Sequence, residues 1–182
     1  MGYLLLAMLI PKFYDLTNTF WIGHISYSAL AISEQYEFIS VTTEIVNETL
    51  PFGILAPIAQ SYRDREKAIS ILKAGLAVQL VFSIALMSVV LLLTPQFVSS
   101  IGTPAEIVAQ TSRYLSMKSI ALPFDSLAII LLMTIKSMRR GREVIYLVLS
   151  SVAMNIILDL LLISNMPFSM NLGLDGAAMG YV

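Results

Sequence analysis

An aspartate and an asparagine lie one helical turn apart inside an otherwise apolar segment of this chain. The segment VIYLVLSSVAMNIILDLLLI covers residues 144–163, about the length that crosses a bilayer, and Asp159 is its only charged residue. Asn155 lies four residues earlier and so on the same helical face. A buried carboxylate is tolerated in hydrocarbon where it faces a cavity, a partner or an ion. The side-chain oxygens of this pair suit a transferable proton or a hard cation such as Na⁺.

A second set of acids forms a stripe along the apolar segment that begins near residue 29. Its members share one helical face, because they are separated by three, seven and four residues: Glu34, Glu37, Glu44 and Glu48. The outer two are either solvated at the interface or part of a cavity lining. Glu44 and Glu48 either form a buried ion pair with Lys118 or Arg113, or line a cavity that attracts cations. Two carboxylates one turn apart cannot both ionise cheaply in a low dielectric, so one of this pair is expected to take up protons.

Other polar residues within apolar segments have both a structural and a functional interpretation. Asp125 lies two turns beyond Lys118 on the same face, so it either pairs with that lysine or lines the same cavity as the glutamates. Asp15 and Asn18 are three residues apart and could face Asp159. Asp15 could equally be half-exposed in a frayed helix.

The composition indicates that the elements carrying these residues cross a membrane. Hydrophobic residues make up 57% of the 182-residue chain and charged residues 13%, and the mean hydropathy is +0.81. These values lie outside the range of ordinary soluble domains. The chain has no cysteine, which excludes disulfides and thiolate chemistry. We therefore predict an all-α integral membrane protein.

The apolar runs and their breakers predict one domain, residues 1–182, built as a polytopic helical bundle. The predicted helices cover residues 3–25, 29–62, 68–93, 104–138, 144–163 and 173–182. The second is expected to kink or partly unwind near Pro51, Gly53 and Pro57. The third is expected to stop before Thr94-Pro95. Five helices would span fully, and the sixth is expected to be truncated.

The basic residues predict the orientation of the bundle. Eight of the eleven fall in two clusters: Arg63, Arg65, Lys67 and Lys73, then Lys136, Arg139, Arg140 and Arg142. The positive-inside rule therefore puts the N-terminus and the loops near 63–67 and 139–143 in the cytoplasm. We expect a multi-pass protein of the plasma, or inner, membrane.

Several function classes have no support in the sequence. There is no phosphate-binding glycine loop, no HExxH and no Gly-x-Ser-x-Gly elbow, so we expect no enzyme. The basic clusters are short and explained by topology, so no nucleic-acid partner is expected. No cofactor is expected beyond a coupling ion.

Several motifs in succession resemble the N-terminal half of a known transporter family. They are NTFWIGHI, PFGILAPIAQSYRDREKA, IALPFDSLAIILLMTIKSMRRGRE and MNIILDLLLI followed by LGLDGAAMG. At these spacings they are similar to the multidrug and toxic compound extrusion (MATE) family of cation-coupled antiporters. The resemblance implies two six-helix lobes around a central cavity that opens alternately to each side. This chain would be one lobe, and the C-terminal lobe would be its partner.

The resemblance also implies roles for particular residues. The fifth-helix pair that binds Na⁺ or H⁺ in the family falls on Asn155 and Asp159. The first-helix acid of many members falls on Asn18, and Asp15, one turn earlier, is the alternative. Where members often place a hydroxyl residue in the sixth helix, this sequence has Gly180 and Tyr181. The glutamate stripe is not part of the family pattern.

The expected function is therefore secondary active antiport that exports organic, mainly cationic, compounds in exchange for H⁺ or Na⁺. Its partners would be membrane lipid, small organic cations and the second lobe. One alternative is a lipid-linked oligosaccharide flippase of related architecture, against which the acids of the second helix argue. The other is a structural or regulatory membrane protein whose buried charges hold helices together.

Overall fold

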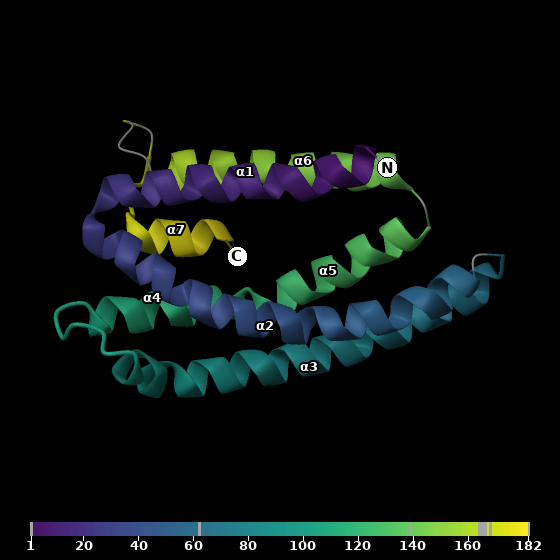
Figure 1. The fold of residues 1–182 in the computed structure, drawn as a ribbon, viewed down its shortest axis with the longest axis horizontal. Coiled ribbons are helices and arrows are strands. Elements are labelled where there is room, and N and C mark those ends of the chain that lie inside the picture. The colour runs from purple at the N-terminus through teal and green to yellow at the C-terminus, as the bar shows by residue number, and fades with distance from the viewer. Residues whose placement is uncertain (1, 62, 139, 164–166, 168, 182) are drawn as a thin grey trace.

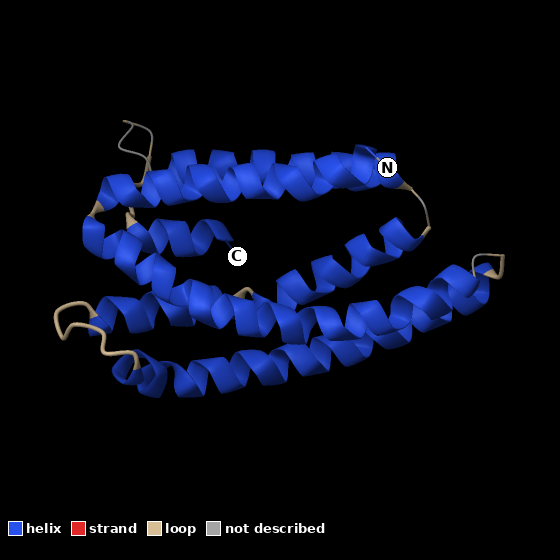
Figure 2. Ribbon diagram, viewed as in Figure 1, coloured by secondary structure: helices blue, strands red, loops and turns tan. Residues whose placement is uncertain are grey.

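The fold is all-α, as predicted, in every part of the chain that the structure describes (Figure 2). The computed structural model describes the backbone of all residues except 1, 62, 139, 164–166, 168 and 182, and not the side chains of 2–5, 7, 8 and 181. The helices are α1 (Gly2–Ile25), α2 (Tyr27–Gln60), α3 (Arg65–Ser100), α4 (Val108–Ile120), α5 (Leu122–Ser137), α6 (Gly141–Leu162) and α7 (Leu174–Tyr181).

The helices pack in an order that brings distant parts of the sequence together. α1 lies along α6, and α2 crosses obliquely to pack on α1, α3 and α5 (Figure 1). α3 also packs on α4 and α5, whereas the short α7 lies against α6 and α4. A buried cluster containing Ile32, Tyr36, Tyr114, Leu115 and Ala178 joins α2, α4 and α7.

The chain reverses at two ends of the bundle, in the alternating manner of a multi-pass membrane protein. The start of α1 and the α2–α3 and α5–α6 connections lie at one end (Figure 1). The ends of α1, α3 and α6 lie at the other. Three candidate spans among the described residues are long and apolar enough to cross a membrane: Arg65–Ser100, Val108–Ser137 and Gly141–Leu162. Large apolar side chains such as Leu92, 73% exposed, face outward as lipid-facing residues do.

Two short side chains set helix starts. The Ser26 hydroxyl accepts a hydrogen bond from the Ala29 amide at 3.0 Å at the start of α2. The Asp64 carboxylate accepts one from the Lys67 amide, also at 3.0 Å, at the start of α3. Both are N-caps, which satisfy amides that have no partner within their helix.

The prolines behave differently from one another. α2 bends along its course but remains an unbroken helix through Pro51 and Pro57, so no unwinding occurs there (Figure 1). α3 continues through Pro95 to Ser100, beyond the predicted end of the third helix. The Thr94 hydroxyl donates to the Val90 carbonyl at 2.8 Å within this turn. This bond does not replace the one that Pro95 omits, because the carbonyl four residues before Pro95 is that of Leu91.

The predicted helix over 104–138 is divided, in contrast, into α4 and α5 at Ala121. Pro123 stands at the start of α5 and has no amide hydrogen for the preceding turn. The Ala121 carbonyl instead accepts bonds from the Phe124 and Asp125 amides, which begin α5. This break puts the C-terminal end of α4 and the N-terminal end of α5 in the bundle interior, beside Lys118 and Asp125.

Candidate functional site

The aspartate of the fifth predicted helix is buried where α1, α6 and α7 meet. Asp159 is 5% exposed, and its Oδ2 accepts a hydrogen bond from the Tyr14 hydroxyl of α1 at 3.0 Å. On the other side lies α7, so close that a Cβ placed on Gly180 would be 3.4 Å from Oδ1 of Asp159. Both carboxylate oxygens therefore have a defined neighbour, and each comes from a different helix.

Two residues predicted to accompany Asp159 are less deeply buried than Asp159 itself. Asn155 is half-buried one turn earlier on α6, and Asn18 is half-buried on α1, one turn after Tyr14. The hydrogen bond to Asp159, however, comes from Tyr14, which the sequence did not single out. With a phenol, an amide and a carboxylate near one another, the groups present are those that ligate a hard cation or relay a proton.

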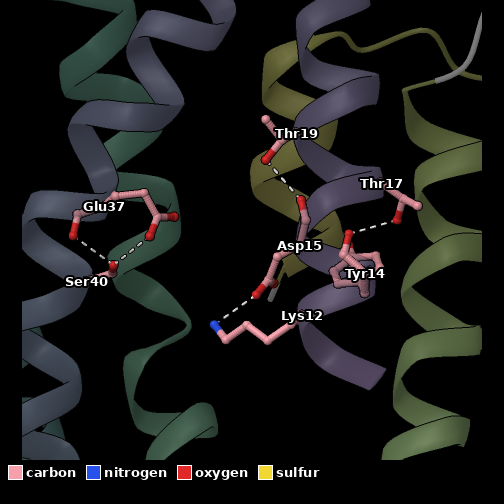
Figure 3. A network of polar contacts seen from close by, with 7 residues as sticks. All are labelled: Lys12, Tyr14, Asp15, Thr17, Thr19, Glu37 and Ser40. Carbon is pink, nitrogen blue, oxygen red and sulfur yellow. Dashed lines mark hydrogen bonds and ion pairs between the residues drawn. The ribbon is translucent and has the colours of Figure 1, made fainter. Parts of the chain in front are cut away.

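Asp15 has a different partner. Its carboxylate forms an ion pair with the Lys12 ammonium at 3.1 Å, three residues earlier on α1, and both side chains are largely exposed in the structure. In Figure 3 this pair extends from α1 toward α2, whereas Tyr14 lies toward α6. Asp15 is therefore on the α2 side of α1 and not against Asp159.

The glutamate stripe faces the interior only in part. Glu34, Glu37 and Glu44 are exposed, and Glu48 is half-buried. The Ser40 hydroxyl can donate to the backbone carbonyl of Glu37, at 3.0 Å, and to the side-chain Oε2 of Glu37, at 3.3 Å (Figure 3). In Figure 3 the Glu37 side chain extends from α2 toward Lys12 and Asp15. Its place in a cavity lining stays a prediction.

Arg113 does not pair with the glutamates, as one interpretation of the sequence proposed. Its guanidinium instead contacts the Asp175 carboxylate of α7 at 2.8 Å. The sequence gives no signal for this contact, because the two residues are sixty-two positions apart. The pair ties the start of α7 to α4, and so helps to hold the helix that lies against Asp159.

Lys118 is buried in the last turn of α4, and its exposed fraction is 5%. Its ammonium lies over the ring of Tyr36, 4.5 Å from the centroid, and 5.4 Å from the centroid of the Tyr114 ring. The two rings meet edge to face, with centroids 6.3 Å apart. Lys118 thus contacts aromatic faces from both α2 and α4.

Carboxylates from several helices surround this ammonium at longer range, among them Glu37 of α2 and Asp125 of α5. Asp125 is half-buried at the start of α5, and Lys118 is the charged group of opposite sign that acts on it. The pairing of Asp125 with Lys118 stays a prediction.

Comparison with known proteins identifies the family to which the chain belongs. The family model described as MatE matches residues 4–161, which include Tyr14, Lys118 and Asp159. The chain belongs to the MatE family. No curated protein matches it.

Solved structures of MATE and related transporters share the fold of this MatE chain. A MOP superfamily transporter from Pyrococcus furiosus, described as having a binding pocket of reverse polarity, superposes with a TM-score of 0.86 at 18% identity over 98% of this chain and 39% of that chain. An outward-facing multidrug resistance MATE transporter superposes with a TM-score of 0.85 at 18% identity, over 97% of this chain and 39% of that chain. A MATE protein in complex with MaD3S superposes with a TM-score of 0.85 at 17% identity, over 97% of this chain and 39% of that chain.

These matches establish the architecture and its scale. At such identities they show the fold alone, and the chain spans about two fifths of the length of those transporters. The MatE chain is therefore a multi-pass membrane protein that corresponds to one part of a larger transporter fold.

Two groups of site residues in the MatE chain were missed at the level of sequence. Tyr14 could have been found from its spacing, because it lies one turn before Asn18 and so shares the helical face that was assigned to the ion site. Tyr114 could have been found in the same way, because it lies one turn before Lys118. Tyr36 carried no such signal, since only the packing of α2 on α4 brings it to Lys118.

Proposed function

We propose that the protein is a secondary active antiporter that exports organic cations in exchange for H⁺ or Na⁺. The observation that carries the proposal is the buried Asp159 carboxylate, held by Tyr14 at the meeting point of three helices. A buried acid in a membrane bundle is costly to keep without a role, and acids that line ion paths are the common exception. Membership of the MatE family supports transport as the activity.

The coupling step follows from the charge of Asp159. While ionised, this carboxylate accepts the Tyr14 hydrogen bond and attracts cations electrostatically. A proton or a Na⁺ that binds there, with Asn155 as a second oxygen ligand, removes that charge and weakens the attraction to Tyr14. Because α1, α6 and α7 meet at this point, the local change alters their packing. The ion and the substrate are coupled because each binds with different affinity to the two arrangements of these helices.

The proposed charge of the substrate follows from the acids of α2 and α5. Glu37, Glu44, Glu48 and Asp125 supply negative charge on the side of α2 and α5. In this proposal they favour a cation in the cavity, and the coupling ion and the substrate then compete for the same negative field. The second lobe, which the length of the solved transporters supports, would close the other side of the cavity.

The proposed orientation puts the basic end of the bundle in the cytoplasm. The α2–α3 and α5–α6 connections, next to Arg63, Arg65, Arg140 and Arg142, lie at the same end as the start of α1. Arg139, the remaining arginine of the second cluster, lies outside the described residues. The clustering of the others supports the positive-inside assignment.

The proposal is tested by ethidium efflux from an efflux-deficient host that expresses the full-length protein. Wild type is compared with Asp159→Asn and with Glu106→Gln, a control that removes an exposed carboxylate from the α3–α4 connection. Proton and sodium gradients are collapsed in turn. We expect efflux to depend on one of the two gradients. We also expect Glu106→Gln to retain efflux and Asp159→Asn to lose it. Efflux indifferent to Asp159→Asn would overturn the assignment.

The flippase remains the second candidate, and one observation favours it. Lys118 is a buried cation in the lobe interior, and a pyrophosphate-linked lipid needs cationic groups in its cavity. The surrounding carboxylates oppose this function, because they repel a pyrophosphate. Absence of ethidium efflux, together with translocation of a pyrophosphate-linked lipid in vesicles, would favour the flippase.

A further inference from the structure

The environment of the Lys118 ammonium is that of a bound organic cation. Aromatic faces within about 6 Å attract a cation, most strongly when water is excluded. Lys118 has two such faces, those of Tyr36 at 4.5 Å and Tyr114 at 5.4 Å. Tyr36 and Tyr114 are themselves only 4% and 1% exposed, so the two ring faces are shielded from solvent.

The electrostatic field at the Lys118 ammonium favours a positive charge from several directions. Lys118 stands in the last turn of α4, where the carbonyl end of the helix carries partial negative charge. The carboxylates of Glu37 and Asp125 add to that field. An anion is therefore repelled from this place, and a neutral group gains little from it.

One polar atom beside the Lys118 position, the hydroxyl oxygen of Tyr114, has no assigned function. The Tyr114 hydroxyl is buried and has no hydrogen-bond partner among the described residues. Such a group is costly to bury. A ligand with a polar head placed against this ring could satisfy it, whereas the intramolecular packing does not.

We propose that Tyr36, Tyr114 and Glu37 form a binding site for an amine cation, and that Lys118 occupies this site as a tethered, intramolecular ligand. The side chain of Lys118 is an alkyl chain that ends in an ammonium, so it has the chemistry of the ligand class it represents. An external amine can enter only when Lys118 withdraws. Its apparent affinity is then the intrinsic affinity multiplied by the fraction of time for which Lys118 leaves the site free. The identification of this amine as transported cargo rests on the proposed function, but the site itself does not.

The test is chemical rescue of protein stability. Lys118→Ala removes both the ammonium and its alkyl stem, and hexylammonium is then titrated into the full-length variant in lipid nanodiscs. We expect a saturable rise of about 1–2 °C in the unfolding midpoint at roughly tenfold excess over the dissociation constant. Wild type and Lys73→Ala, which truncates an exposed lysine on α3, are expected to shift by less than a third as much.

Two comparisons separate cation recognition from cavity filling. Hexanol, the uncharged ligand of similar length, is expected to stabilise Lys118→Ala much less than hexylammonium does. Adding Tyr36→Leu is expected to remove the hexylammonium effect. Equal shifts with hexanol and hexylammonium, or equal shifts in wild type and Lys118→Ala, would overturn the proposal.

A second variant covers the case in which Lys118→Ala does not fold. Lys118→Met keeps the apolar stem, so only the ammonium position is vacant and methylammonium is the ligand used. A rise in the midpoint with methylammonium but not with methanol is expected, and no rise would overturn the proposal. Because the readout is stability, failure here leaves gradient-driven efflux intact, and failure of efflux leaves the rescue intact.

Discussion

Gln79 is predicted to hold α2 together at Pro51. Proline has no amide hydrogen, so the carbonyl four residues earlier, that of Asn47, loses its helical partner. The side-chain amide of Gln79, from α3, donates to this carbonyl at 3.0 Å. Gln79 is 0% exposed and Asn47 2%, so water cannot replace the bond. We therefore attribute the continuity of α2 through Pro51 to a side chain of the neighbouring helix.

The cost of Gln79→Leu follows from the group it leaves behind. An orphaned buried carbonyl costs about 1–3 kcal/mol, whereas hydrogen bonds between membrane helices average about 0.6 kcal/mol. The substitution also removes the Gln79 Oε1, which is buried without a partner among the described residues and offsets part of the loss. We expect a net destabilisation of about 1–2 kcal/mol.

A double-mutant cycle with Pro51→Ala isolates this bond. The Pro51→Ala substitution supplies the missing amide hydrogen, so the Asn47 carbonyl no longer needs Gln79. Unfolding free energies of the full-length protein, measured by SDS titration in mixed micelles, are expected to show a Gln79→Leu cost smaller by about 1 kcal/mol in the Pro51→Ala background. Ser83→Ala, a buried change one turn along α3, is the control and is expected to be additive. Equal Gln79→Leu costs in both backgrounds would refute the reasoning.

Other contacts give further predictions. Tyr14→Phe removes a charge-assisted hydrogen bond to Asp159 worth about 1.5–3 kcal/mol, so the ion concentration for half-maximal efflux should shift by about tenfold or more. An unchanged value would contradict the assigned contact. Gly176→Ala places a Cβ 2.7 Å from a backbone oxygen of α6 and should lower stability by about 1–3 kcal/mol in SDS titration; an unaltered titration would contradict it. Arg113→Asp should cost about 0.2–1 kcal/mol, and Asp175→Arg in the same chain should restore it. Failure of that restoration would argue against the pair.

The sequence was sufficient to predict the fold class and the central acid. An apolar segment with one charge identified Asp159 because bilayer insertion is so sensitive to charge, and the structure buries that residue among three helices. The positions of helices along the chain followed from apolar length in the same way. These features depend on local composition alone.

The partners of that acid could not be predicted, because they depend on how helices rotate against each other. Tyr14 and Asp15 are adjacent in sequence, yet they lie on different sides of α1, and only the packing on α6 decides which one meets Asp159. The sequence interpretation left open whether Asp15 faces Asp159 or is half-exposed.

The prolines show the same limit. Pro95 and Pro123 each stand in a long apolar run, but α3 continues through the first and the chain divides into α4 and α5 before the second. Pro51 is accommodated through Gln79, a residue of another helix. Whether a proline breaks a membrane helix is therefore decided by its neighbours in space, which a single sequence does not reveal.

The most direct test of the central claim is ion flux in proteoliposomes that contain the full-length protein. Substrate is added on one side, and the movement of H⁺ or Na⁺ through the protein is followed with an ion-sensitive dye trapped inside. If Asp159 couples the two fluxes, substrate should drive ion movement in wild type and in Glu106→Gln but not in Asp159→Asn. Substrate-driven ion movement of undiminished rate in Asp159→Asn would contradict the account.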